Sequence, residues 1–180
     1  MGTCLWYYII PAGITLFIIW AIILAGYQDR DVKNNKIVGN EEWKSWPSNL
    51  KLPEYFAHNI LPYFLWTLCL FMFTYGAYNI DCEIDTSVGT FYKELFILVN
   101  IMTIFGFVYF FLLYNVISAI IVNVIALVTL AGMIFIVSGN SVEAAWFLYP
   151  YVLWTSYFIY VMYYIYKHNQ THPQMRMDLI

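Results

Sequence analysis

Few side chains in this sequence are of a kind that performs catalysis or binds metals. The three histidines, His58, His168 and His172, have no Cys or His partner at zinc-ligand spacing. The acidic run at 81–85 lacks the glycine and the terminal glutamate of a calcium loop, so we interpret it as a solvated loop. The sequence therefore predicts no catalytic residue and no metal site.

The three cysteines, Cys4, Cys69 and Cys82, do not make a disulfide framework. We expect Cys4 to be an inert thiol, and acylation near the membrane interface is the alternative. There is no glycine-rich phosphate loop and no basic patch, so nucleic acid is not an expected partner. No cofactor is required by any of these residues.

Aromatic side chains are the remaining chemical signal, and they gather in the last apolar segment. Residues 144–169 contain seven tyrosines and two tryptophans. Interfacial belts of Tyr and Trp explain many of them. They explain Trp66 and Trp154 less well, because each should lie inside the membrane. Core packing is the default interpretation of such rings, and stacking on a flat hydrophobic ligand is the alternative.

The elements that carry these rings are apolar segments. The chain has 180 residues, 62% of them hydrophobic and 11% charged, which is typical of a membrane protein. All charged residues fall outside five windows, each long enough to cross about 30 Å of hydrocarbon as a helix: 5–26, 59–80, 95–113, 116–137 and 144–166. The run at 95–137 must fold back, with a turn expected at Tyr114 and Asn115. The sequence predicts one all-α domain over 1–180, a bundle of five transmembrane helices.

Basic residues set the expected orientation. Five lie in the first loop and two in the tail at 167–180. The positive-inside rule therefore places the first loop and the C-terminus in the cytosol. The loop at 27–58 is polar first and then rich in aromatics and prolines, and we expect its second half to form a lid. Asn100 and Asn123 inside spans are expected to bond across helices.

Six short elements are spread along the chain: Pro11-Ala12-Gly13, Trp46-x-x-x-Leu50-x-x-Pro53, Trp66, Tyr75-Gly76-Ala77-Tyr78, Phe110-Phe111 and Leu148-Tyr149-Pro150-Tyr151-x-x-Trp154. Together they resemble the translocator protein family, also called the tryptophan-rich sensory proteins or TspO/MBR family, and the resemblance covers most of the chain. The third span departs from the family, since Thr103, Ile104, Gly106 and Phe107 stand where the family has polar and Trp-Pro residues.

The resemblance implies a pocket beneath the first loop that binds porphyrins or sterols, and a possible homodimer. Its implied ligand-binding residues are Pro62, Leu65, Trp66, Trp154, Phe158 and Val161. Val161, Tyr163 and Lys167 would form a sterol-contact element, which also fits a loose sequence pattern for cholesterol contact. Trp46, Leu50 and Pro53 would shape the lid.

Three functions follow from these expectations. The first is a non-catalytic membrane receptor or carrier for porphyrin, haem or a cholesterol-like sterol. The second is degradation of a bound porphyrin, which the resemblance links to Trp154. The third is a structural or interaction protein that has kept the bundle and lost the pocket. The resemblance implies the outer mitochondrial membrane or another cellular membrane such as a bacterial envelope.

Overall fold

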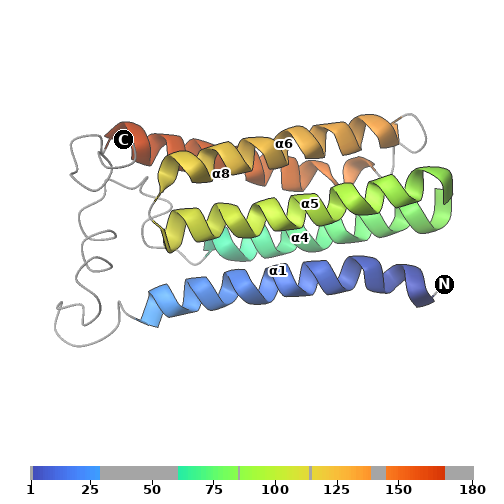
Figure 1. Ribbon diagram of the computed structural model, residues 1–180, viewed down its shortest axis with the longest axis horizontal. Helices are drawn as coiled ribbons and strands as arrows, with labels where there is room; N and C mark the ends of the chain where they lie inside the picture. Colours follow the sequence, from blue (N-terminus) through green and yellow to red (C-terminus); the bar gives the residue numbers. More distant parts are fainter. Residues whose placement is uncertain (1, 29–60, 85, 114, 139–144, 169–180) are drawn as a thin grey trace.

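Five long helices make up the described part of the chain. The computed structural model describes residues 2–28, 61–84, 86–113, 115–138 and 145–168. The helices are α1 (Gly2–Gln28), α4 (Leu61–Asn79), α5 (Thr86–Phe111), α6 (Val116–Ser138) and α8 (Tyr149–His168), and a π-helical turn, η1 (Ile80–Ile84), follows α4 (Figure 1). No strand occurs within these ranges. The predicted all-helical bundle of five helices is therefore confirmed.

Apolar composition places the protein in a membrane. Within the described residues, four segments are long and apolar enough to cross a bilayer: Cys4–Leu24, Leu61–Cys82, Phe91–Phe111 and Val116–Ser138. The fifth helix, α8, has 20 residues and a length of about 30 Å. It does not reach the same hydropathy, because seven of its residues are tyrosine. It nevertheless packs beside the other four, and the chain is an integral membrane protein.

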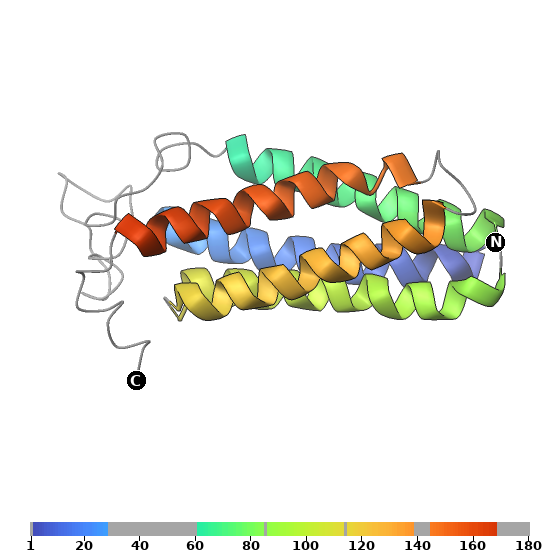
Figure 2. The same ribbon diagram turned by 90° about the horizontal axis from the view of Figure 1, so that it is seen from above.

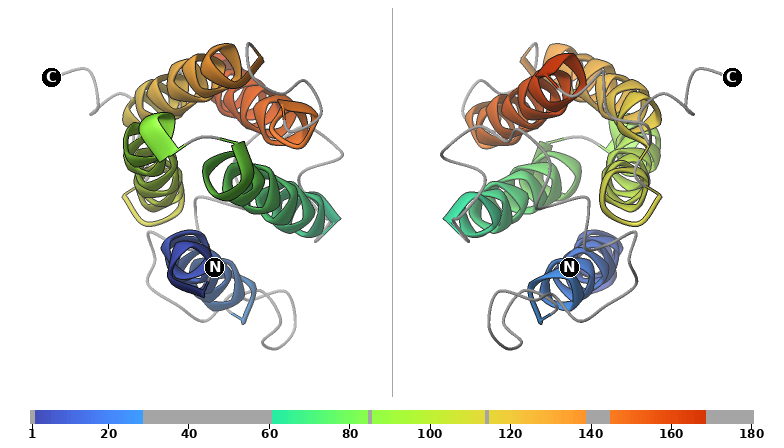
Figure 3. Two further views of the ribbon diagram at one scale, coloured as in Figure 1. Left: turned by 90° about the vertical axis from the view of Figure 1, so that its right-hand side faces the viewer. Right: turned by 90° about the vertical axis from the view of Figure 1, so that its left-hand side faces the viewer.

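The helices are arranged as a ring. Neighbouring pairs are α1 and α4, α4 and α8, α8 and α6, α6 and α5, and α5 and α1. The view along the bundle shows this order (Figure 3), and the view from above shows α8 between α4 and α6 (Figure 2). The last turns of α1 and α8 lie at one end of the bundle, whereas the start of α1 lies at the other, with η1.

The helix ends extend beyond the charge-free windows in places. α5 begins at Thr86, nine residues before the window at 95, since a helix can continue past the hydrocarbon where charged residues are solvated. The turn expected between the third and fourth spans is present at Asn115. The Asn115 Oδ1 accepts a hydrogen bond of 2.7 Å from the Ser118 backbone N–H, which caps the start of α6. Tyr114 lies outside the described residues.

Aromatic rings pack through the centre of the bundle. Phe73 of α4 stacks on Tyr151 of α8 with 4.8 Å between ring centroids, and on Phe96 of α5 at 4.9 Å. Phe107 of α5 stacks on Phe158 of α8 at 5.0 Å. Each of these five rings is buried. Offset or edge contacts of this kind stabilise a core by about 0.5–1.5 kcal/mol per pair beyond area burial.

The helices α5 and α6 pack closely against each other at a glycine, and we call the boundary between them the closed seam. The amide of Asn123 on α6 occupies the space in which a Cβ at Gly106 of α5 would lie. The Asn123 Nδ2 donates to the Ala119 carbonyl of its own helix at 2.8 Å, and the Asn100 Nδ2 likewise donates to Phe96. The expectation of hydrogen bonds across helices is therefore wrong for these amide groups. Asn123 joins the two helices through close packing instead, because glycine lets the backbones approach.

A disulfide ties the start of α1 to η1. Cys4 and Cys82 are joined, with 6.5 Å between their Cα atoms and a sequence separation of 78. The expectation of an inert thiol is wrong for Cys4, because its sulfur is bonded to Cys82, whereas Cys69 is free. The pairing follows from the topology, because antiparallel α1 and α4 bring the start of one to the end of the other. Sequence spacing alone does not reveal such a contact.

The acidic run also differs from its expected form at its first residue. The Asp81 carboxylate is buried and pairs with the Lys93 ammonium of α5 at 3.0 Å. The interpretation of this run as a solvated loop is therefore wrong for Asp81. A carboxylate loses hydration on burial and needs a compensating charge, and Lys93 supplies it from the next helix.

Candidate functional site: a groove between α4 and α8

A groove runs along the boundary between α4 and α8, with a volume of about 480 Å³. That volume lies in the range of small-molecule sites. Eight residues line it: Leu61, Pro62, Leu65, Cys69, Pro150, Leu153, Trp154 and Tyr157. None of the eight is charged. The groove is therefore suited to an apolar ligand.

Helical periodicity explains which residues line the groove. On α4, Leu61, Leu65 and Cys69 are four residues apart and form one stripe. On α8, Pro150, Leu153, Trp154 and Tyr157 follow the spacing i, i+3, i+4, i+7. The two stripes face each other because α4 and α8 are neighbours in the ring. A ligand in the groove would contact both helices.

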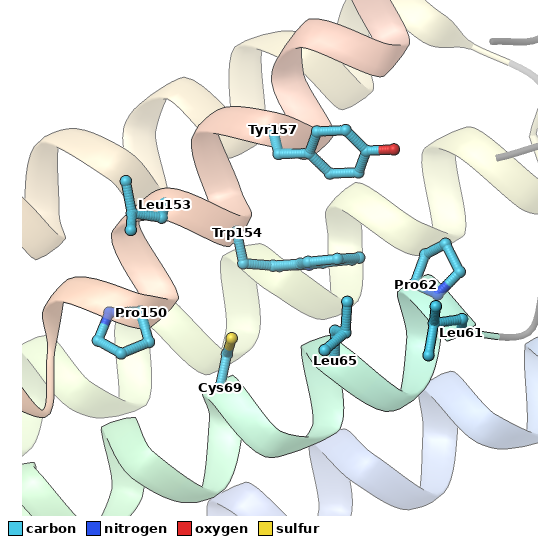
Figure 4. Close-up of a pocket in the computed structure, with 8 residues that line it drawn as sticks. All are labelled: Leu61, Pro62, Leu65, Cys69, Pro150, Leu153, Trp154 and Tyr157. Carbon is cyan, nitrogen blue, oxygen red and sulfur yellow. The ribbon is translucent and has the colours of Figure 1, made fainter. Parts of the chain in front are cut away.

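Trp154 has the largest ring among the described residues that line the groove. Its ring projects from α8 towards α4, beside Leu65 and in the direction of Leu61 and Pro62 (Figure 4). It is 8% exposed, so most of its surface is fixed by packing. Tyr157 lies one turn further along α8, with 5.6 Å between the two ring centroids. These two rings are rigid faces on which a flat molecule can stack.

The groove opens outward, towards the surface that lipid covers. Leu65 is 47% exposed and Leu153 is 70% exposed, and Leu61 is exposed as well. In a bilayer, an apolar surface of this kind is surrounded by lipid and not by water. A hydrophobic molecule dissolved in the bilayer would therefore have direct access to the groove from the side.

Three of the six expected ligand-binding residues line this groove, namely Pro62, Leu65 and Trp154. The other three, Trp66, Phe158 and Val161, are buried in the core. Trp66 packs on Phe107 at 5.6 Å. One residue along a helix turns the side chain by about 100°, so Leu65 faces the groove and Trp66 faces the bundle centre.

Five lining residues were not expected from the sequence: Leu61, Cys69, Pro150, Leu153 and Tyr157. A signal for three of them was present. Leu61 and Cys69 lie four residues either side of Leu65, and i±4 positions share a helix face. Pro150 stands in the same relation to Trp154. Nothing in the sequence indicated that Leu153 lines a site rather than facing lipid.

The unusual residues of the third span fill the side of the bundle opposite the groove. The Thr103 hydroxyl lies 3.0 Å from the Tyr151 hydroxyl and also donates to the Val99 carbonyl at 2.8 Å. The single Thr103 hydroxyl proton is used in the bond to Val99, so the Tyr151 hydroxyl donates to the Thr103 Oγ1 across α5 and α8. Trp66 lies within electrostatic reach of the same hydroxyl, without a hydrogen bond of good geometry. Thr103, Gly106 and Phe107 thus serve packing in this protein.

The expected sterol-contact residues do not share one surface. Val161 is fully buried, whereas Tyr163 is 53% exposed and Lys167 is exposed at the end of α8. Val161 therefore contributes to the core, and Tyr163 faces the membrane side. The expected lid residues, Trp46, Leu50 and Pro53, lie outside the described residues.

The architecture defines a class: a five-helix membrane bundle with an aromatic core and a lateral apolar groove. The family model for the TspO/MBR family matches residues 14–167, which include α4, α5 and α6 completely and most of α1 and α8. The chain belongs to the TspO/MBR family. No curated protein and no solved structure shows significant similarity to it.

Proposed function

We propose that the protein is a membrane receptor or carrier that binds a flat hydrophobic molecule, a sterol or a porphyrin, in the groove between α4 and α8. The observation that carries the proposal is the Trp154 ring, held between two helices in a groove of about 480 Å³ whose eight described lining residues are all uncharged. Membership of the TspO/MBR family supports a receptor or carrier role in general.

The lining favours a sterol over a porphyrin. A sterol has one hydroxyl and an otherwise apolar body, which suits Leu61, Leu65 and Leu153. A porphyrin with two carboxylates would need a cation near each carboxylate to offset lost hydration. Among the described lining residues, the side chains offer the Tyr157 hydroxyl, the Cys69 thiol and the Trp154 indole N–H as polar groups, and none of them is a cation. A porphyrin would therefore have to place its carboxylates outside the groove.

The test compares two tryptophans near the same helix. The purified protein in lipid nanodiscs would be titrated with dehydroergosterol and, separately, with protoporphyrin, while energy transfer from Trp to the ligand is measured. Trp154→Leu keeps an apolar side chain and removes the stacking face. We expect affinity to fall by about tenfold, the equivalent of about 1.4 kcal/mol.

Trp146→Leu is the matched control, because Trp146 is 66% exposed and does not line the groove. The Trp146→Leu variant should bind each ligand with the same affinity as the unchanged protein. Equal loss in both variants, or none in Trp154→Leu, would place the ligand elsewhere. The absence of saturable binding of either ligand would contradict the proposal and would favour a structural or interaction role, consistent with the packed Phe107 and Phe158 rings.

Cys69 provides a second, independent readout. It is the one free cysteine of the three in the sequence, since Cys4 and Cys82 are joined. An apolar maleimide in the bilayer should label Cys69 slowly, and a bound ligand should slow the labelling further. Labelling that is indifferent to a saturating ligand would argue against occupancy of this groove.

A further inference from the structure

A second cluster lies at the end of the bundle where α1 begins, and no part of the groove contributes to it. It contains the sulfurs of Cys4 and Cys82 and the carboxylate of Asp81. All three ligand atoms lie within 4.8 Å of one another, and the Cys4 Sγ is 3.1 Å from the Asp81 Oδ2. We propose that, once the disulfide is reduced, Cys4, Cys82 and Asp81 bind a zinc ion.

The donor set fits zinc in type and in spacing. Thiolate sulfur and carboxylate oxygen are ordinary zinc ligands, with bonds of about 2.3 and 2.0–2.2 Å. Ligand atoms of a tetrahedral ion at these distances lie about 3.5–4 Å apart. The Cys4 and Cys82 backbones are already placed for this, because 6.5 Å between their Cα atoms requires only side-chain rotation to separate the sulfurs. Magnesium and calcium prefer oxygen ligands and do not match this set.

Charge balance also supports a dication. Two thiolates and one carboxylate carry three negative charges, and binding of Zn²⁺ reduces the net charge to minus one. The Lys93 ammonium, 3.0 Å from the Asp81 Oδ2, neutralises that remaining charge. Lys93 also lies over the Tyr7 ring of α1, 5.3 Å from its centroid, which helps to hold the ammonium beside the cluster. The loaded site would be neutral overall, as a partly buried site requires.

The Tyr8 hydroxyl lies next to the cluster, and the Tyr92 hydroxyl lies near Tyr8. Tyr8 and Tyr92 are fully buried, and neither hydroxyl has a partner of good hydrogen-bonding geometry among the described residues. Tyr8 lies within electrostatic reach of both Asp81 and Tyr92. Three protein ligands leave a fourth position for water on a tetrahedral zinc ion. A water there would supply a partner for the Tyr8 hydroxyl.

The Cys4 and Cys82 sulfurs can therefore either form the disulfide or bind zinc, and they cannot do both at once. A phosphine reductant and one water convert the disulfide into two thiols, and the phosphine becomes its oxide. Zinc then binds as the two thiols release their protons to solvent. In the oxidised state the sulfurs bond to each other and cannot act as thiolate ligands. Zinc binding should consequently depend on reduction.

The experiment measures metal in the oxidised and reduced full-length protein. After treatment with a phosphine, removal of the reductant without oxygen and incubation with zinc, the protein would be gel-filtered and its zinc content measured. We expect one zinc per reduced chain and none per oxidised chain. Cobalt substituted for zinc should give a thiolate-to-cobalt charge-transfer band. Circular dichroism of the same samples reports whether the helices persist.

Variants assign the ligands. Cys4→Ser and Cys82→Ser should each abolish the charge-transfer band, and Lys93→Gln should weaken binding about tenfold, as loss of a partner to a ligand does. Cys69→Ser is the matched control and should bind as the unchanged protein does. A reduced, helical protein that retains no zinc would overturn the proposal. So would reduced protein that loses its helices and does not regain them with zinc, or a band that requires Cys69.

Discussion

Two boundaries of the same bundle differ in how they are closed. At the closed seam, between α5 and α6, the Asn123 amide fills the space beside Gly106. At the boundary between α4 and α8, the residues that meet are Leu, Pro, Cys, Trp and Tyr, and a groove remains. Both are antiparallel helix pairs in one membrane, and the size of the side chains at a few positions distinguishes them.

In this bundle, different helix boundaries stabilise the fold and give a ligand access. Small residues allow close backbone approach, which is a general way to join helices in a membrane. A bulky ring such as Trp154 holds two helices apart and presents a flat face between them. The closed seam therefore serves stability, and the open boundary is the place where a ligand can enter. Four changes would test this division.

The largest expected effect is on the closed seam. Gly106→Ala places a Cβ against the Asn123 amide, and relief requires the two helices or the amide to shift. We expect a loss of about 1–3 kcal/mol of stability, as for overpacking elsewhere. Thermal unfolding in detergent, followed by circular dichroism, measures it. Gly132→Ala is the control, because nothing lies within 4 Å of its added Cβ. Asn123→Ala added to Gly106→Ala should restore stability, and failure to do so would show that the seam is not closed by this contact.

The next effect is on the groove. Leu65→Trp should fill the space beside Trp154 and weaken ligand binding by about tenfold or more, or about 1.4 kcal/mol. Its effect on unfolding should be small, because Leu65 is 47% exposed. Leu68→Trp is the control: Leu68 is 55% exposed on the same helix and does not line the groove. If both tryptophans weaken binding equally, the groove is not the site.

A smaller effect concerns the bond between α5 and α8. Tyr151→Phe removes the hydroxyl that pairs with Thr103, and Thr103 keeps its bond to the Val99 carbonyl. Hydrogen bonds between membrane helices contribute about 0.6 kcal/mol on average. We expect the free energy of unfolding to fall by about that amount, and thermal unfolding measures it. Tyr149→Phe, at a residue 42% exposed, should have no effect, and equal losses would remove the special role of Tyr151.

The smallest effect is on the link between α1 and α4. The Trp20 Nε1 donates to the Thr67 Oγ1 at 3.0 Å. Trp20→Phe retains an aromatic ring and removes this donor, so we expect the free energy of unfolding to fall by less than about 0.6 kcal/mol. Ligand affinity should not change, because neither residue lines the groove. A drop in affinity would show that the position of α1 affects the open boundary.

The fold could be predicted from the sequence because the membrane imposes simple requirements. Charge-free windows mark the helices, and an uncharged run of twice the membrane thickness must turn, as it does at Asn115. The structure at the polar ends of these windows was harder to predict from the sequence. Asp81 reads as a solvated residue until its pairing with Lys93 is known, and that pairing depends on the packing of η1 against α5.

The site could be predicted only in part, for a geometric reason. Trp154 was found because a tryptophan deep in a span is unusual, and Pro62 and Leu65 came from the family resemblance. Trp66 came from the same reasoning, yet it faces the centre. The sequence shows which rings lie in the membrane and does not show the rotation of each helix about its axis. Cys4 and Cys82 lie 78 residues apart, and only the tertiary arrangement brings them together.

A photoreactive sterol tests the central claim most directly. The sterol would be activated in nanodiscs, and mass spectrometry would locate its adducts along the chain. A ligand in the groove should modify residues on α4 at 61–69 and on α8 at 150–157, and excess unlabelled sterol should suppress these adducts. Saturable adducts on the outer face of α5 and α6, with none on α4 or α8, would contradict the account.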